Sequence, residues 1–424
     1  MKKKYVRWTL WTIASPFILF IILCILIYLP PIQNFLVDKA AVYASEATGM
    51  NISVGRISLS FPLNLVVTNV DAASPHNDTL LSVRRLQVNV QLLPLLKKQV
   101  EVDGISLQGA TVNSNDLIHG MKLNGTLGEL FISSHGVALD PETAIVNKVL
   151  LKDTDLSLCL NDTAAADTAA SDTTYWKIIL QDIDLQNVSF ALDMPLDSLS
   201  LAASLDNAIL RDGLIDLHKS AYSLQTFRIK NGRVRYDSGK PLAADSLPSG
   251  LDPSHIALTD IGVKLDSLYY GGRNMKAIIS QFVLKERSGV EIVSATGRMV
   301  SNDKVLRVPS LKLETRDSYL ELNAAMDWNA LDFKDEGLVS ARLMADIGKP
   351  DVVRFMGSMD EKFIRQYPSE PLRIRTGIDG DLNKLKLTTL TAELPGALGL
   401  FARGELTHLT DSLLRGGDIT LEAE

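Results

Sequence analysis

Cysteine is almost absent from the sequence. The two cysteines are Cys24, inside an apolar N-terminal run, and Cys159, far beyond it. A disulfide framework needs a larger, closely spaced set, so we predict none, and the fold must depend on burial and strand pairing. A basic excess is also missing, since the net charge is −7. We therefore predict no nucleic-acid partner.

Catalytic and metal-binding motifs are missing as well. The sequence contains no His-Glu-x-x-His, no Cys-x-x-Cys, no phosphate-binding glycine loop and no Gly-x-Ser-x-Gly elbow. Its acidic pairs, Asp153 with Asp155 and Asp182 with Asp184, fall on one side of predicted strands, where a solvated face is the ordinary role. The sequence thus predicts no enzyme, no catalytic residue, no cofactor and no metal site. The six histidines are scattered: His76, His119, His135, His218, His255 and His408.

The N-terminus carries the strongest signal that is present. Residues 1–7 form a basic tail, and no charged side chain follows until Asp38. The apolar stretch Trp8–Leu29 has the length of about 20 residues that a transmembrane helix needs. The basic flank predicts a cytoplasmic N-terminus and an exported remainder. The alternative is a cleaved signal peptide, whose apolar core is usually only about 7–15 residues long.

A short juxtamembrane helix is predicted over residues 34–49. Asn34 can cap its start, and Gly49 suits a left-handed C-terminal cap. Its apolar side would pack against the entrance of the following sheet. A solvated spacer is the alternative interpretation.

From Asn51 onward the apolar period becomes two, which predicts β-strands with one apolar and one wet face. Pairs such as Asp103-Gly104, Asn231-Gly232 and Asp379-Gly380 are typical of turns between strands. The alternating segments are Ile57 to Leu65, Leu86 to Leu92, Ile261 to Leu265, Leu311 to Leu313, Leu320 to Leu322 and Leu385 to Leu387.

A loose internal repeat runs through these strands. Val100–Val112 aligns without a gap with Ile178–Phe190, and shorter copies begin at Val149 and Phe227. In each copy an apolar pair precedes Gly, Asp or Asn, and alternation then resumes in the other phase. A bulge or tight turn would produce that change of phase. The repeat indicates a sheet that grows along one axis, although coincidence among β-rich segments is the alternative.

The order of motifs at the N-terminus resembles a known family. A lysine-led single span is followed by Ile52–Ser60, Leu65–Val70, and Leu86–Leu96 leading into Val100–Val112. This order resembles the opening of the AsmA-like proteins, including the TamB branch, over about 110 residues. The resemblance implies a taco-shaped sheet with an apolar inner wall, anchored in the inner membrane and reaching into the periplasm. It also implies a role in phospholipid traffic or, as for TamB, in assembly of outer-membrane proteins with a partner barrel.

The predicted fold is therefore mainly β. A single N-terminal transmembrane helix (8–29) precedes an elongated, curved, repeat-like antiparallel β-sheet of groove shape with a few short helices, spanning 50–424. A closed sandwich, whose apolar faces bury one another, is the alternative. In a groove, the candidate lipid-facing residues are those of the first strands. They are Ile57, Leu59, Phe61, Leu63, Leu65, Leu86, Val88 and Val90.

Smaller features interrupt the predicted sheet. The tracts 161–174 and 237–254 are predicted to be flexible loops, and residues 350–367 to be a helix that begins at Pro350. A basic patch on a predicted hairpin, Arg228, Lys230, Arg233 and Arg235, could meet a partner or an anionic headgroup, or be a solvated face. The final residues 417–424 resemble the middle of a strand, so the protein could continue beyond 424.

The leading functional hypothesis is a single-pass inner-membrane protein whose periplasmic β-groove conveys phospholipid between the inner and outer membranes. Its partners would be the inner-membrane bilayer and phospholipid acyl chains. A TamB-type factor for outer-membrane protein assembly or secretion, working with an outer-membrane barrel protein, is the alternative. An anchored scaffold or adhesion sandwich is the third.

Overall fold

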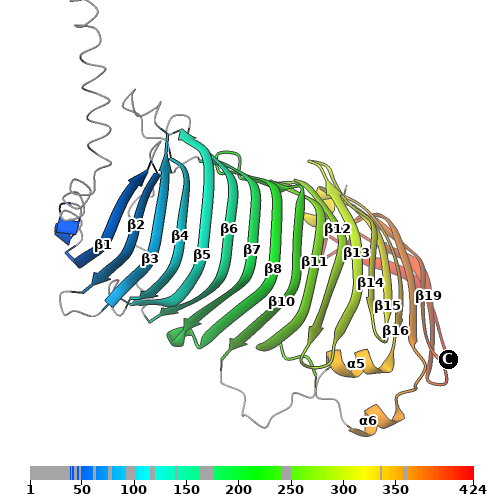
Figure 1. The fold of residues 1–424 in the computed structure, drawn as a ribbon. Coiled ribbons are helices and arrows are strands. Elements are labelled where there is room, and N and C mark those ends of the chain that lie inside the picture. The colour runs from blue at the N-terminus through cyan, green and yellow to red at the C-terminus, as the bar shows by residue number, and fades with distance from the viewer. Residues whose placement is uncertain are drawn as a thin grey trace, which may run out of the picture. The chain divides into compact units, whose positions relative to one another are not determined.

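The structure is a computed structural model in which β-strands dominate. It describes residues 49–60, 64–74, 79–91, 102–114, 120–138, 142–161, 176–239, 250–334, 337–356 and 361–424, together with residues 39, 41–42 and 45–46. Twenty strands are assigned to one sheet (Figure 1). The prediction of a mainly β chain is confirmed.

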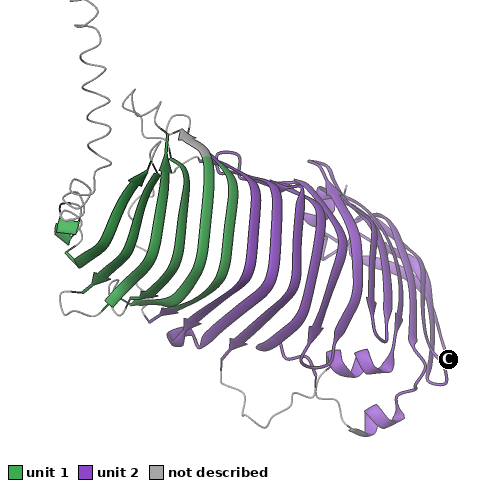
Figure 2. Cartoon of the chain, in the orientation of Figure 1, with its two compact units in different colours: residues 1–137, 146–158 green, residues 138–145, 159–424 purple. Residues whose placement is uncertain are grey.

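The chain divides into two compact units (Figure 2). Unit 1 comprises residues 1–137 and 146–158, and unit 2 comprises residues 138–145 and 159–424. The strands of unit 1 are β1 (Asn51–Ser60), β2 (Asn64–Ala73), β3 (Thr79–Val90), β4 (Val102–Asn113), most of β5 (Met121–Ala138) and most of β6 (Thr143–Leu160).

Within its described residues, unit 2 contains the remaining strands, one 3-10 helix and three α-helices. The strands are β7 (Lys177–Met194), β8 (Leu199–Asp216), β9 (Ala221–Leu224), β10 (Thr226–Ser238), β11 (His255–Gly271), β12 (Asn274–Glu286), β13 (Glu291–Ser301), β14 (Val305–Thr315), β15 (Tyr319–Asp327), β16 (Leu338–Ile347), β17 (Leu372–Asp381), β18 (Lys384–Leu394), β19 (Leu398–Thr407) and β20 (Gly416–Ala423). The helices are η1 (Pro195–Asp197), α4 (Trp328–Leu331), α5 (Lys349–Met356) and α6 (Glu361–Gln366).

Each unit is an antiparallel meander. In unit 1, β1 to β5 pair in chain order. In unit 2, β7 pairs with β8, and from β10 each strand pairs with the next to β20. β9 and β10 share one place between β8 and β11, so they act as a single strand interrupted at Gln225.

One alternating run proves to be two strands. Ile57 to Leu65 reads as a continuous strand pattern, but β1 ends at Ser60, β2 begins at Asn64, and the two pair antiparallel. Leu59 lies directly opposite Leu65 in that hairpin. The apolar residues of both strands still lie on one face, because residues that are directly opposite each other in a pair of strands share a face of the sheet.

The repeat marks an irregularity within each strand. Its copies place Gly109, Asp153, Asn187 and Asn231 at equivalent positions, and these residues have φ values of 61°, 49°, 51° and 54°. A left-handed residue lets the alternation restart in the other phase without turning the apolar side chains away from their face. In β4, for example, Ile105 and Leu107 precede Gly109, and Ala110 and Val112 follow it on the same apolar face. The change of phase thus falls at a left-handed residue in each copy. A register shift typical of a bulge accompanies Asn231 in the β10–β11 ladder, whereas the ladders at Gly109 and Asn187 show none.

The predicted turns are wrong. Asp103-Gly104 lies inside β4, Asn231-Gly232 inside β10, and Asp379-Gly380 inside β17. Gly104 serves a close approach instead, because a Cβ there would lie 3.1 Å from the carbonyl oxygen of Ile132. Asn231 supplies a left-handed residue within the strand. A residue type that tolerates positive φ thus marks either a turn or a bulge, and local sequence does not separate the two.

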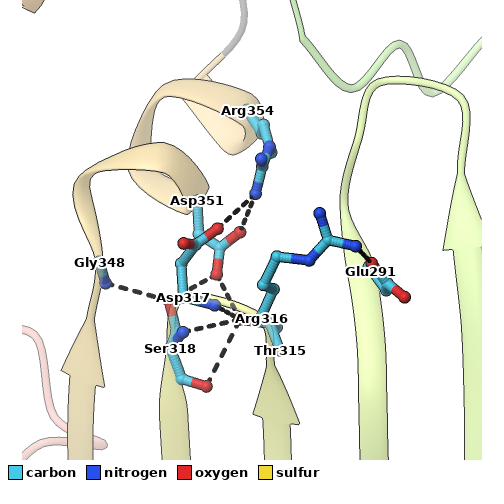
Figure 3. A network of polar contacts seen from close by, with 8 residues as sticks. All are labelled: Glu291, Thr315, Arg316, Asp317, Ser318, Gly348, Asp351 and Arg354. Atoms are coloured by element: carbon cyan, nitrogen blue, oxygen red, sulfur yellow. Dashed lines mark hydrogen bonds and ion pairs between the residues drawn. The ribbon is translucent and has the colours of Figure 1, made fainter.

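The predicted helix over 350–367 is replaced by two helices, α5 and α6, at the ends of the strands of unit 2 (Figure 1). Asp351 fixes α5 to the β14–β15 turn and is only 1% exposed. Its carboxylate accepts hydrogen bonds from the Thr315 hydroxyl, from the Ser318 hydroxyl at 2.6 Å and from Arg354 at 3.0 Å (Figure 3).

Arg354 completes this network by donating to Asp317 at 2.8 Å. Burial disfavours its charged form, but the hydrogen bonds from Arg354 to Asp317 and Asp351 outweigh burial and raise its pKa. The guanidinium therefore stays charged between two carboxylates. Nearby, Gly348 donates its N–H to the Ser318 hydroxyl at 3.1 Å, which ties the start of α5 to the same turn (Figure 3).

Most residues of the predicted N-terminal elements lie outside the part of the chain that the structure describes. The basic tail 1–7 and the span 8–29 lie outside the described residues, and no helix within the described part is long and apolar enough to cross a membrane. Of the predicted helix 34–49, the described residues 39, 41–42 and 45–46 are helical. Gly49 has φ of 69° and donates its N–H to the carbonyl of Ser45 at 2.9 Å.

The two predicted loops fall at connections between strands. β10 ends at Ser238 and β11 begins at His255, which agrees with a connection over 237–254, although residues 240–249 lie outside the description. The tract 161–174 lies outside it except for Asn161, which follows β6.

Candidate functional site

The apolar face of unit 1 is the first candidate site. Register pairs line up four rows of side chains across β1 to β5, and opposed residues share a face. Every member of the rows is apolar or glycine. The rows are Leu59-Leu65-Val88-Ile105-Ile132, Ile57-Val67-Leu86-Leu107-Leu130, Val54-Val70-Val83-Ala110-Leu127 and Ile52-Ala72-Leu81-Val112-Gly125.

Five of the predicted lipid-facing residues lie together in these rows, namely Ile57, Leu59, Leu65, Leu86 and Val88. Val90 lies opposite Val102, where the ladder is irregular. Phe61 and Leu63 lie outside the described residues. That these side chains meet lipid stays a prediction.

The other face of unit 1 is polar. Arg56 lies in line with Thr68, Arg85, Gln108 and Glu129 across the same five strands. The unit therefore has one apolar and one hydrophilic face, as its alternation predicts.

Unit 2 repeats this arrangement over more strands. Two rows cross β7, β8 and β10 to β20, and within them only Gly297 and Thr376 lack an apolar side chain. The first row is Ile183-Leu210-Phe227-Leu265-Ile279-Gly297-Leu311-Leu322-Leu343-Thr376-Leu390-Ala402-Leu421. The second is Leu185-Ala208-Ile229-Val263-Phe282-Ala295-Leu313-Leu320-Ala345-Ile374-Ala392-Leu400-Ala423.

Burial within the two rows depends on side-chain size. The buried members are all alanines, namely Ala208, Ala295, Ala345 and Ala402. The leucines, isoleucines, valine and phenylalanines of the rows keep part of their surface in solvent, and Leu421 at the β20 edge is 61% exposed. Small side chains are sheltered between taller neighbours, but nothing in the described part of the chain fully covers the tall ones. A sandwich core would bury them.

Several buried hydrophobic side chains of unit 2 form a cluster at the ends of strands. The one hydrophobic cluster of buried side chains in the described part is Ala330, Val339 and Leu382, with Met326 and Ile378 packed against it. Ala330 belongs to α4, so the cluster lies at the α4 ends of the strands, and α5 and α6 lie at the opposite ends (Figure 1). The middle of the apolar face has no comparable cluster among the described residues.

Charged residues of unit 2 gather on the opposite face, where several acidic and basic residues pair across strands. Arg211 pairs with Asp182, Arg375 binds Asp346 at 2.6 Å, and Lys384 binds Glu405 at 3.1 Å. Asp184, the other member of its predicted acidic pair, accepts from the amides of Gln186 at 3.1 Å and Asn207 at 3.2 Å. These partners fit the solvated role predicted for Asp182 and Asp184.

The predicted basic patch lies on this polar face, in the single strand β10 and not in a hairpin. Arg228 and Lys230 line a hollow of about 700 Å³, together with Lys264 of the next strand. Arg235 binds Asp237 at 2.6 Å, and Arg233 lies outside the hollow. Lys264 is absent from the sequence prediction because only strand pairing brings it beside Arg228.

Catalytic groupings are not found in the described ranges. No three His, Cys, Asp or Glu side chains within them come together as metal ligands. His255, which is 8% exposed, lies 2.8 Å from Asp252, and its hydrogen bond helps to lower the pKa of that carboxyl. Asp252 also accepts the backbone N–H of Ser254, as expected of a residue that caps the turn before β11.

Comparison with known proteins gives no assignment. No protein-family model matches the chain, and no curated protein sequence matches it.

Proposed function

We propose that this protein carries phospholipid along an open apolar β-sheet face, anchored by its N-terminal segment in the inner membrane and conveying lipid toward the outer membrane. The observation that supports the proposal most is the pair of apolar rows in unit 2, whose tall side chains stay partly exposed. Acyl chains would cover them and remove apolar surface from water, worth about 25 cal/mol per Å².

The length of the apolar rows suits a surface along which lipid moves better than it suits a single lipid-binding site. Twelve steps between thirteen strands, at about 4.8 Å each, give an apolar track of about 58 Å. Along it an acyl chain meets aliphatic side chains at nearly every step, so no one position should hold it much more tightly than the next. The four rows of unit 1 offer the same kind of surface nearest the predicted membrane anchor.

Photo-crosslinking from matched positions on the two faces tests the proposal. A benzophenone amino acid at Leu59, Val88 or Leu322 should form adducts with phospholipid in cells. At Ser58, Gln87 or Glu321, the neighbouring residues on the opposite face, it should form few. Mass spectrometry of the purified full-length protein identifies the adducts. Equal labelling of both faces, or adducts with protein and none with lipid, would contradict the lipid-carrier proposal.

Depletion distinguishes the TamB-like alternative. Loss of outer-membrane barrel proteins with normal lipid distribution would favour an assembly factor, and altered outer-membrane lipid with normal barrel proteins would favour lipid transport. A scaffold or adhesion role would produce neither change.

A further inference from the structure

The hollow on the polar face of unit 2 brings three cations together, Arg228, Lys230 and Lys264. Arg228 and Lys264 lie directly opposite each other on β10 and β11, and Lys230 is two residues along β10. Like charges placed opposite each other in an antiparallel pair destabilise the sheet. On the same face Arg211, Arg375 and Lys384 each bind a carboxylate. The feature that sets Arg228, Lys230 and Lys264 apart is that all three line one hollow.

The other cross-strand neighbours of these three cations are uncharged. Ile209 lies opposite Arg228 on β8, and Gln281 lies opposite Lys264 on β12. Asn207 lies opposite Lys230. None of these neighbours is acidic.

Two carboxylates do approach the group, and both have other partners. Asp260 lines the hollow, but it binds Lys285 at 2.9 Å, an interaction that raises the pKa of the lysine. Asp266 lies 3.9 Å from Lys264 and also accepts a hydrogen bond from the Ser280 hydroxyl. Among the described residues, no carboxylate is therefore bound to Arg228 or Lys230.

The shape of the hollow indicates what a ligand would resemble. Gly262 lacks a side chain, and so the floor is open down to Val283 and Ile209. The walls carry the amides of Asn207 and Gln281 beside the cations. A volume of about 700 Å³ is within the range of small-molecule sites. The cations can bind a phosphate, the amides can bind hydroxyl groups, and the apolar floor can contact a short carbon chain. Together these groups suit a phosphorylated polyol.

We propose that this hollow binds the phosphate of a phosphorylated polyol, either a free sugar phosphate or the polar headgroup of a glycerophospholipid. Arg228 offers paired N–H donors to phosphate oxygens, while Lys230 and Lys264 neutralise the remaining charge. Because Arg228, Lys230 and Lys264 lie on the face opposite the apolar rows, a phosphate bound to them is separate from the surface proposed to hold acyl chains.

Calorimetric titration of the full-length protein in phosphatidylcholine nanodiscs tests the site. The probes are inorganic phosphate, glucose 6-phosphate and glycerophosphoglycerol. The variant R228Q/K230Q/K264Q should weaken binding by at least about ten-fold, since it removes charge-assisted hydrogen bonds. The control R233Q/R298Q/R307Q removes the same charge from exposed positions on the same face, outside the hollow, and should change binding less than about two-fold.

The three probes separate the sources of the phosphate. Tighter binding of glucose 6-phosphate than of the other two assigns a free sugar phosphate, and tighter binding of glycerophosphoglycerol assigns a lipid headgroup. Thermal unfolding gives a second readout, because phosphate should raise the melting temperature of the wild type and not of the triple variant. The proposal is overturned if no probe binds saturably, or if the control variant loses as much affinity as R228Q/K230Q/K264Q.

Discussion

At the scale of single residues, the carboxylate of Asp351 holds α5 against the sheet. It is nearly inaccessible to solvent and bonds with Thr315, Ser318 and Arg354. A buried carboxylate is stable only with such partners, and removal of one partner leaves the others unsatisfied. The network therefore explains why an acidic residue lies in the first turn of α5, where it also meets the positive end of the helix dipole.

Replacing Asp351 by alanine should lower the free energy of unfolding by about 2–4 kcal/mol, because Thr315, Ser318 and the partly buried Arg354 lose a shared acceptor. Urea denaturation followed by circular dichroism measures the change. Lys312→Ala is the control, since its contact with Glu321 is 4.0 Å long and half exposed. It should cost less than about 1 kcal/mol. Equal effects of the two substitutions would contradict a special role for Asp351.

At the scale of the strand, one left-handed residue keeps the apolar side chains on one face. In β10, Phe227 and Ile229 precede Asn231, and Val234 and Tyr236 follow it, in opposite phase along the sequence. All four nevertheless lie opposite apolar residues of β8, and a regular strand would have turned the second pair to the polar face. The left-handed conformation is thus what makes the two half-strands compatible.

Asn231→Val and Asn231→Gly should separate this backbone effect from the side-chain bond to Asp206. Both substitutions remove that bond, but valine is strained at φ of 54° whereas glycine is not. The valine variant should be less stable than the glycine variant by about 1–2 kcal/mol in urea unfolding. If the two variants unfold together, the backbone conformation at Asn231 contributes nothing to the register.

The strands could be predicted from the sequence, because period-two alternation indicates a sheet with one apolar face and one face in solvent. The change of phase in the repeat likewise indicated the residues with positive φ. Strand ends were harder to predict, since Asp103-Gly104 and the alternation through Ser60 and Asn64 give the same local signal in a turn and in a strand. The hollow could not be predicted, because Arg228 and Lys264 become neighbours only through pairing of β10 with β11.

At the scale of the whole molecule, the proposed function depends on whether each lipid passes along the whole length of the apolar rows or binds at one of many independent sites. A set of independent lipid sites loses capacity in proportion to the sites removed. A track loses transport when it is blocked at one point, because every lipid must pass that point. Copurified lipid and transfer rate therefore respond differently to the same substitution.

Leu320→Glu with Leu343→Glu interrupts both rows of unit 2 on the adjacent strands β15 and β16. Passing an acyl chain across a carboxylate forces its desolvation at a cost of several kcal/mol, so transfer of fluorescent phospholipid between vesicles by the full-length protein should slow by at least about ten-fold. The lipid that copurifies should fall much less, because the rows on either side of the break remain. Asn323→Glu with Met344→Glu, on the opposite face of the same strands, is the control and should leave both quantities unchanged.

The comparison of the two readouts decides between a track and a store. If L320E/L343E lowers transfer only as much as it lowers bound lipid, the rows hold lipids independently and the protein is a carrier surface, not a path. If the control variant slows transfer equally, the added charge acts through the fold, and unfolding in urea should show the loss of stability. Because Leu320 and Leu343 are only partly buried, their replacement should be tolerated by the fold, whereas the same change inside a closed sandwich would unfold it. A folded but transfer-deficient L320E/L343E variant would therefore support both the open face and its use as a track.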